Sequence, residues 1–162
     1  MQVLVTGGCG FIGVNLAARL LMSGRFSLTV LDNMSTGSAA TLEAALSERG
    51  LDHSAVTVIE GDVRDTELCE EACRDMDAVV HLAAQAGVVQ SIDDPFLDAE
   101  VNVGGTLNML EAARNTGAGM FVFASSNAPL GAAPPPSRED TAPRPLSPYG
   151  AAKLAGEGYC SA

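Results

Sequence analysis

Residues 3–13 read V-L-V-T-G-G-C-G-F-I-G, and this stretch decides the fold. The apolar run at 3–5 predicts a buried strand, and an apolar pattern of helical period follows the glycines through Phe11, Ile12 and Leu16. A strand, a glycine turn and a helix in this order are the setting of a dinucleotide-binding fingerprint. The spacing is G-x-x-G-x-x-G rather than the strict G-x-G-x-x-G, so an ordinary glycine-rich turn is the alternative interpretation.

The glycines of this turn, Gly7, Gly10 and Gly13, suit the approach of a diphosphate. Without a Cβ atom the backbone can turn tightly, and a phosphate can come close to the main chain. The first N–H groups of the following helix have no partner within the helix, and its positive dipole end favours an anion. We therefore expect a dinucleotide to bind here.

Asp32 indicates which dinucleotide is preferred. It ends a second predicted strand, at 27–31, and lies 19 residues beyond Gly13, near the spacing at which an acidic residue meets the adenosine ribose. A carboxylate accepts hydrogen bonds from both ribose hydroxyls and repels a 2′-phosphate, so we expect NAD rather than NADP. The alternative is that Asp32 only ends the strand or begins a turn.

Predicted strands and helices alternate along the rest of the chain. Further strands are expected at 56–59, 77–83 and 120–124, and helices near 39–49, 65–74 and 95–115. This alternation predicts an α/β fold with a doubly wound parallel sheet, whose ligands bind beyond the carboxyl ends of the strands. Polar or small residues follow each strand at that edge: Gly7, Asp32, Asp62, Ala84 and Ser126.

The composition excludes several classes of protein. The 162 residues suffice for one domain, and a net charge of −11 argues against a nucleic-acid partner. No apolar run reaches the length of about 18 residues that a transmembrane helix needs, and no signal-peptide pattern opens the chain. We expect a cytoplasmic protein without a membrane partner, with reduced cysteines. Cys69 and Cys73 share a helix face but have no further ligands nearby, so no metal site is expected.

Two features of the predicted interior need a reason. His81 lies within an almost wholly apolar strand, where a hydrogen-bonded core histidine is favoured over a catalyst. Gly104 and Gly105 stand in the middle of a predicted helix, where each glycine costs about 1 kcal/mol relative to alanine. We expect another part of the chain to approach closely at both glycines.

Seven of the eight prolines lie between Pro129 and Pro148, which predicts a long irregular loop.

A helix is expected to start at Ser147-Pro148, with Tyr149 and Lys153 on one face because they are four residues apart. A phenol is a weak base at neutral pH until a neighbouring positive charge stabilises its anion, so this pair suits general base catalysis. Ser126 is placed to bond the same substrate hydroxyl. A Tyr-x-x-x-Lys pattern alone arises often by chance, and serines also end strands for local reasons.

Several motifs together resemble the extended short-chain dehydrogenase/reductases, in particular the NAD-dependent nucleotide-sugar epimerases and dehydratases, with UDP-glucose 4-epimerases as the nearest type. The resemblance spans essentially the whole chain. The motifs that carry it are T-G-G-C-G-F-I-G (6–13), D-N-M-S-T-G (32–37), G-D-V-R-D (61–65), H-L-A-A-Q-A (81–86), N-V-G-G-T-L-N (102–108), S-S-N-A (125–128) and P-Y-G-A-A-K-L-A-G-E (148–157).

The resemblance implies a role for each part of the cofactor site. The diphosphate would be held by Gly7, Gly10, Phe11, Ile12 and Gly13. The adenosine ribose would be held by Asp32, Asn33, Ser35 and Gly37, and the adenine would be flanked by Asp62 and Val63. The nicotinamide side would be lined by Leu82, Ala83, Ala84 and Gln85, with Asn102 beneath and with Tyr149 and Lys153 also in contact.

The same resemblance implies a reaction. Ser126, Tyr149 and Lys153 would be catalytic, and the sugar of a UDP-sugar would be oxidised transiently at C4 by hydride transfer to bound NAD, with Tyr149 as base. The keto sugar would turn over and take the hydride back on its other face. The helices that begin at Pro95 and Tyr149 would form the interface of a homodimer.

The chain also departs from the family pattern. It lacks an aromatic residue in 127–131, and Val89 stands where an arginine is expected. No Thr-Asp-Glu follows Ser125-Ser126, which argues against a 4,6-dehydratase. Another nucleotide-sugar dehydratase, a decarboxylase, a reductase and a non-enzymatic NAD-binding module stay open as alternatives.

The last departure concerns length. Family members carry a C-terminal substrate domain, and this chain stops nine residues after Lys153. We expect residues 1–162 to be an NAD-binding Rossmann domain without that substrate domain. We therefore expect little epimerase activity from these residues alone.

Overall fold

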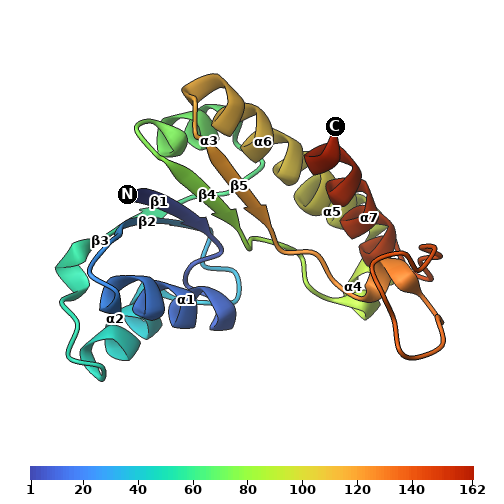
Figure 1. Ribbon diagram of the computed structural model, residues 1–162, viewed down its shortest axis with the longest axis horizontal. Helices are drawn as coiled ribbons and strands as arrows, with labels where there is room; N and C mark the ends of the chain where they lie inside the picture. Colours follow the sequence, from blue (N-terminus) through green and yellow to red (C-terminus); the bar gives the residue numbers. More distant parts are fainter.

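The computed structural model describes residues 1–162, which form a five-stranded parallel sheet with helices on both faces (Figure 1). The strands are β1 (Gln2–Thr6), β2 (Ser27–Asp32), β3 (Val56–Glu60), β4 (Ala78–His81) and β5 (Met120–Phe123). Their order in the sheet is β3-β2-β1-β4-β5. The chain moves outward from β1 in both directions, so the switch point of a doubly wound sheet lies between β1 and β4. The predicted Rossmann fold is confirmed.

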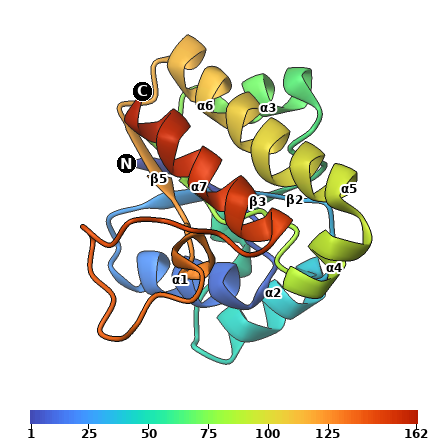
Figure 2. The ribbon, with the colours of Figure 1, turned by 90° about the vertical axis from the view of Figure 1, so that its right-hand side faces the viewer.

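Two groups of helices cover the sheet. One face carries α1 (Phe11–Met22) and α2 (Ala39–Ser47), and the other carries α3 (Thr66–Cys73) and α6 (Gly105–Thr116) (Figure 1). Two short helices, α4 (Val88–Asp93) and α5 (Pro95–Ala99), lead into α6, and α7 (Pro148–Ser161) packs beside them (Figure 2). No helix is both long and apolar enough to cross a membrane.

The alternation of side chains along the strands divides the core into two layers. Val3 and Val5 of β1 pack with α1 and α2, whereas Leu4 between them packs with α3 and α6. Side chains of a strand point alternately to opposite faces, so a strand covered on both sides must be apolar throughout. This arrangement fixes β1 at the centre of the molecule and leaves its carboxyl end free for the glycine turn.

Most predicted elements appear with small shifts at their ends. Asp65 and Asp94 cap their helices by accepting the N–H groups of Leu68 and Leu97, as expected for N-cap residues. The predicted strand at 77–83 is shorter, because β4 ends at His81. The helix α4 was not predicted, because its six residues are too few to show an apolar period. Between Leu130 and Pro148 the chain has no helix or strand, as its prolines predict.

The predicted helix at 95–115 is interrupted by a π-helical segment, η2 (Glu100–Gly104). Single turns of π-helix inside α-helices occur often at functional sites. A Cβ atom on Gly105 would lie 2.5 Å from Cγ2 of Val63, so the expected close approach is confirmed there. The expectation is wrong for Gly104, where a Cβ atom would meet only the carbonyl of Ala99 at 3.9 Å.

Candidate functional site

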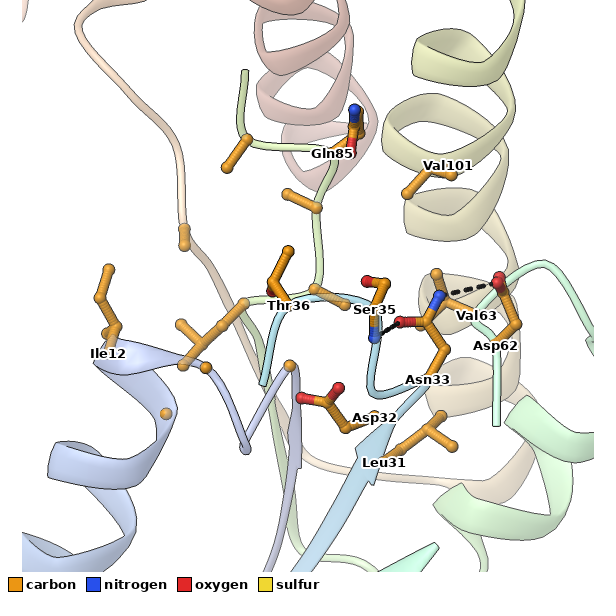
Figure 3. Close-up of a pocket in the computed structure, with 18 of the residues that line it drawn as sticks. Ile12, Leu31, Asp32, Asn33, Ser35, Thr36, Asp62, Val63, Gln85 and Val101 are labelled. Atoms are coloured by element: carbon orange, nitrogen blue, oxygen red, sulfur yellow. Dashed lines mark hydrogen bonds between the residues drawn. The ribbon is translucent and has the colours of Figure 1, made fainter. Parts of the chain in front are cut away.

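A cleft of about 520 Å³ lies at the carboxyl ends of the strands (Figure 3). Its volume falls within the range of small-molecule sites, about 300–1,000 Å³. Most of the predicted binding residues line it, namely Gly7, Gly10, Phe11, Ile12, Gly13, Asp32, Asn33, Ser35, Asp62, Val63, Leu82, Ala83, Ala84 and Gln85. The sheet edge chosen from the sequence is therefore where the cleft is found.

The glycine turn brings α1 against the sheet. Gly7 has a φ of +68°, and a Cβ atom there would lie 2.7 Å from the amide nitrogen of Ala83. A Cβ atom on Gly13 would lie 2.4 Å from the carbonyl oxygen of Gly7. Both positions accept only glycine without a shift of the backbone, so close helix–strand packing explains these two residues.

The first turn of α1 is open to an anion. Its N-cap is Gly10, which has no side chain to bond the free N–H groups, and no acidic residue stands in the first turn. A Cβ atom on Gly10 would have only one neighbour, the Gly7 carbonyl at 3.4 Å, so the turn leaves room beside the backbone. An uncapped helix end with a positive dipole and room for a ligand fits a diphosphate group.

Asp32 lies at the end of β2 and holds two loops in place. One carboxylate oxygen accepts the N–H of Cys9 and the other accepts the N–H of Met34, both at 2.9 Å. A carboxylate has about four acceptor positions, so two stay available for the hydroxyls of a ribose. The side chain points into the cleft (Figure 3). Asp32 thus has both a structural role and free acceptor capacity.

A polar network joins the loops after β2 and β3. Asn33 donates to Asp62 at 3.0 Å and accepts the N–H of Ser35 at 3.1 Å (Figure 3). Arg64 donates to both carboxylate oxygens of Asp62, at 2.9 and 2.8 Å, and its own N–H also reaches Asp62. These bonds from Arg64 hold the pKa of Asp62 well below its usual range. With four donors on Asp62, its carboxylate has no acceptor position left for a ligand.

The loop after β4 forms the opposite wall of the cleft and is held from below by Asn102. The Asn102 side chain accepts the N–H of Gln85 at 2.9 Å and donates to the Gln85 carbonyl at 3.1 Å. Asn102 lies in the π-helical segment and is buried, so it does not line the cleft. It acts on the wall through Gln85.

His81 is a hydrogen-bonded core residue, which agrees with the sequence-based preference. Nδ1 lies 2.7 Å from the hydroxyl of Thr6, and Nε2 lies 3.2 Å from the hydroxyl of Thr106. Thr106 donates its own proton to the carbonyl of Asn102, so the donor toward Thr106 is the Nε2–H of a neutral ring. Burial, and then the charge of Lys153, lower the pKa of His81 to about 3.

The three predicted catalytic residues lie on the α7 side of the sheet edge. Nζ of Lys153 is 5.9 Å from the ring centre of Tyr149 and donates to the carbonyl of Ala124 at 2.8 Å. Ser126 follows β5, and its hydroxyl accepts the N–H of Ala128 at 3.2 Å. Tyr149 and Lys153 do not line the main cleft, and Ser126 lines a second, polar cleft of about 440 Å³ instead.

The cleft differs from the predicted site in one residue that was wrongly included and in several that were missed. Gly37, expected at the ribose, does not line the cleft, because its backbone packs against the glycine turn and a Cβ atom would lie 2.2 Å from the Cys9 carbonyl. Sequence reasoning missed eight lining residues: Leu31, Thr36, Gly61, Arg64, Ala86, Leu97, Val101 and Ala124. Thr36, Gly61, Arg64 and Ala86 belong to the quoted motifs and could have been found there. Leu97 and Val101 come from a helix whose approach only the fold determines.

Residues 3–162 match the NAD dependent epimerase/dehydratase family. The chain belongs to that family. The match leaves out Gln2, the first residue of β1. It covers the rest of the five strands and both walls of the cleft. The family is a branch of the extended short-chain dehydrogenase/reductases, so the resemblance seen in the motifs is confirmed.

The relatives of this chain include proteins named UDP-glucose 4-epimerase. The chain is 40% identical to a UDP-glucose 4-epimerase of Mycolicibacterium smegmatis over 161 residues, which are 98% of this chain and 50% of the relative. The chain spans about half the length of the curated relatives it matches.

Solved structures of the family share the fold. The UDP-glucose 4-epimerase of Thermus thermophilus, solved in complex with NAD, has a TM-score of 0.88 and 43% identity, covering 99% of this chain and 50% of that one. DesIV of Streptomyces venezuelae, a dTDP-glucose 4,6-dehydratase solved with NAD, has a TM-score of 0.87 and 33% identity, covering 97% and 49%. Both epimerases and dehydratases therefore lie near this chain.

Proposed function

We propose that this chain is the cofactor-binding part of an NAD-dependent nucleotide-sugar 4-epimerase of the UDP-glucose/UDP-galactose type. The observation that carries the proposal is a single cleft in which an uncapped helix N-terminus and a carboxylate with free acceptor positions, Asp32, lie side by side. That combination suits a diphosphate joined to an adenosine ribose. The UDP-glucose 4-epimerase of Thermus thermophilus, which is 43% identical to this chain over the matched region, supports the proposal.

In this proposal each wall of the cleft has a task. The diphosphate lies against the N–H groups from Gly10 to Gly13, and Asp32 accepts the ribose hydroxyls. Since the Asp62 carboxylate is already occupied, we propose that Val63 and the ordered Arg64 side chain flank the adenine while Asp62 holds that loop. The wall at 82–85 takes the nicotinamide side, where Asn102 fixes the backbone.

Bound NAD would supply reversible hydride transfer at C4 of the sugar. The chain's own residues handle the proton. The Tyr149 phenolate takes the proton of the C4 hydroxyl and becomes a neutral phenol. The Lys153 ammonium, 5.9 Å from the ring centre, stabilises the phenolate before that transfer. Ser126 bonds the same hydroxyl and passes the proton. As the hydride would return to the other face of the sugar, Tyr149 gives its proton back to the C4 oxygen, and C4 is inverted.

The reaction also needs parts of the protein beyond these residues. We propose a UDP-sugar as substrate and a homodimer as the working unit, with α5 and α7 at the interface. Exposed apolar side chains on α4 and α5, among them Val89 and Phe96, support an interface on this side of the molecule.

A nucleotide-sugar dehydratase is the second candidate, favoured by the likeness to DesIV. Against it, the serine pair at 125–126 is followed by Asn127, Ala128 and Pro129, without the acidic residue of a 4,6-dehydratase, and a turn of 3-10 helix begins there at Ala128. A non-enzymatic NAD-binding module is the third candidate. The assay below distinguishes the three.

Replacing Tyr149 by phenylalanine tests the proposed base. Residues 1–162 would be fused to the second half of the Thermus thermophilus enzyme, and the release of UDP-glucose from UDP-galactose measured for this chimera and for its Tyr149→Phe form. We expect the substitution to lower kcat by at least about 100-fold, the usual range for loss of a general base, with NAD binding nearly unchanged.

The unsubstituted chimera is the control. Equal turnover of the two forms would remove Tyr149 as the base. A dehydrated 4-keto product in place of UDP-glucose would favour the dehydratase, and NAD binding without any turnover would favour the binding module.

A further inference from the structure

Lys153 is the only lysine in the chain, and its charge is buried. Only 3% of the residue is exposed, and its one hydrogen bond goes to an uncharged carbonyl, that of Ala124. Nζ also lies 4.7 Å from the ring centre of Phe123, and no carboxylate lies within 4.0 Å of it. Burial lowers the pKa of Lys153 to about 8. An ammonium in such surroundings needs a counter-charge to keep its proton.

Asp98 lies on the element that faces Lys153. It is part of α5, which packs against α7, and only 1% of the residue is exposed. Its Oδ1 accepts a hydrogen bond from the side-chain amide of Asn102 at 2.8 Å. Burial raises the pKa of Asp98, and the bond from Asn102 and then the charge of Lys153 oppose that rise. A buried carboxylate is costly unless a positive charge or hydrogen bonds compensate it, and here both are at hand.

The other charges around α7 are solvated or paired with each other. On the packed elements they are Asp93 of α4, Asp94 at the N-cap of α5, Glu100 paired with Arg64, and the pair Glu111–Arg114 of α6. On α7 itself Glu157 accepts a bond from Ser125, and Cys160 is exposed. β5 and the turn at 128–130 hold no charged residue, and the buried His81 is neutral. Asp98 is the one charged group that supports the protonated form of Lys153.

We infer that Asp98 is a positioning residue for the reaction proposed above: it is the buried counter-charge that keeps Lys153 an ammonium, and Asn102 holds it in place. The inference rests on the proposed function for its role in turnover. When the Tyr149–Lys153 pair gives up one proton, the charge of Asp98 favours its loss from Tyr149 over its loss from Lys153. The same Asn102 side chain also holds the cleft wall at Gln85. One residue of the π-helical segment therefore positions both the cleft wall and Asp98.

The test uses the 162-residue chain with lysine labelled by ¹³C at Cε. Because the chain has a single lysine, one side-chain signal reports the pKa of Lys153 directly. We expect Asp98→Asn to lower that pKa by about 1, the lower end of the effect of a nearby opposite charge. Asparagine keeps an oxygen for the bond from Asn102. An unchanged pKa in Asp98→Asn would overturn the inference.

A matched control removes the same charge from an exposed place. Asp94 caps the same helix four residues earlier, and asparagine caps equally well, so Asp94→Asn should leave the pKa of Lys153 unchanged. If Asp94→Asn lowered it as much as Asp98→Asn, the effect would be one of overall charge and the inference would fail.

The reciprocal variant covers the case in which Asp98→Asn does not fold. Lys153→Met keeps an apolar chain of similar length in the buried position, and coupling between two sites is reciprocal. We expect the pKa of the Asp98 carboxyl, followed by its ¹³Cγ signal, to rise in Lys153→Met. An Asp98 that titrates as before would refute the pairing.

These titrations need neither cofactor nor sugar, so their failure and that of the proposed function can be told apart. In the chimera, Asp98→Asn removes a negative charge beside the Tyr149–Lys153 pair. We expect this substitution to lower the pH at which kcat falls on the acid side, and to lower the maximal kcat. A lowered pKa of Lys153 in a chimera without epimerase activity would leave the pairing standing and refute the proposed function. An active chimera, together with an unchanged pKa of Lys153 in Asp98→Asn, would support the proposed function and refute the pairing.

Discussion

His81 shows, at the scale of single residues, how neighbours decide what a titratable side chain does. A histidine at the carboxyl end of an apolar strand is a natural candidate for acid–base chemistry. Here hydroxyls of Thr6 and Thr106 occupy both ring nitrogens, and burial removes the charge. The ring is therefore a structural link between β1, β4 and α6.

The pKa of His81 gives a prediction about pH. The folded value of about 3 lies below the ordinary value of 6.5, so the unfolded chain binds a proton between these values that the folded chain does not. The stability that His81 contributes is complete above the ordinary value and is lost as the pH falls toward 3. We expect the ring signals of His81 to stay constant in NMR spectra between about pH 8 and pH 5.

The chain has a second histidine, His53, which is exposed in the turn before β3, so its ring signals must be told apart from those of His81. A midpoint for His81 near neutrality would contradict the assigned network and reopen a catalytic role.

Residue types alone located many of the cleft residues but not how each is used. Asp32 was predicted as a ribose ligand, yet its two bonds to backbone N–H groups follow from loops that only the fold brings together. Gly37 was assigned to the ribose because it closes a motif, whereas its packing on Cys9 depends on a contact 28 positions away in the sequence. Contacts of this kind leave no local pattern.

At the scale of elements, caps and glycines marked most boundaries correctly. The π-helical segment after α5 was missed, as α4 was, since its extra residue per turn has no signature in composition. It places Asn102 so that one side chain reaches both Gln85 and Asp98. A sequence can indicate that a helix crosses this region, but the interruption depends on what the helix must contact.

The neighbouring glycines of this region give a matched pair of variants. Gly105→Ala should destabilise the chain by about 1–3 kcal/mol, because its Cβ atom would overlap Val63. Gly104→Ala should stabilise it by about 0.5–1 kcal/mol, because that position is open and helical. Urea unfolding of both variants measures the two free energies. Equal effects of the two substitutions would contradict the packing described for η2 and α6.

At the scale of the molecule, apolar surface is concentrated on the short helices before α6. Val89, Ile92 and Phe96 are 66%, 60% and 82% exposed and lie on α4 and α5, which both pack against α7. Several exposed apolar residues on neighbouring short helices mark an association site more often than isolated ones do. The sequence predicted an interface here by resemblance.

Association through this surface can be measured directly. We expect the chain to sediment as a dimer and Phe96→Glu to sediment as a monomer, since a charge would be buried at the interface. Met22→Glu adds the same charge to a residue that is 63% exposed on α1, across the sheet, and should leave the dimer intact. A monomeric parent chain, or equal effects of the two substitutions, would refute the proposed interface.

The fold as a whole followed from the sequence because strand, glycine turn and helix each had a local signal, and their order admits few topologies. The arrangement of the proposed catalytic residues was harder to predict. Tyr149 and Lys153 were placed together by their spacing, but their relation to the main cleft depends on α7, and they do not line it.

The central claim is that the cleft at the carboxyl end of β1 and β2 binds NAD, and calorimetric titration of the 162-residue chain with NAD and with NADP tests it most directly. The account predicts one NAD site per chain and binding of NADP weaker by at least about tenfold, or about 1.4 kcal/mol, because Asp32 repels a 2′-phosphate. No measurable NAD binding, or NADP binding as tight as NAD, would contradict it.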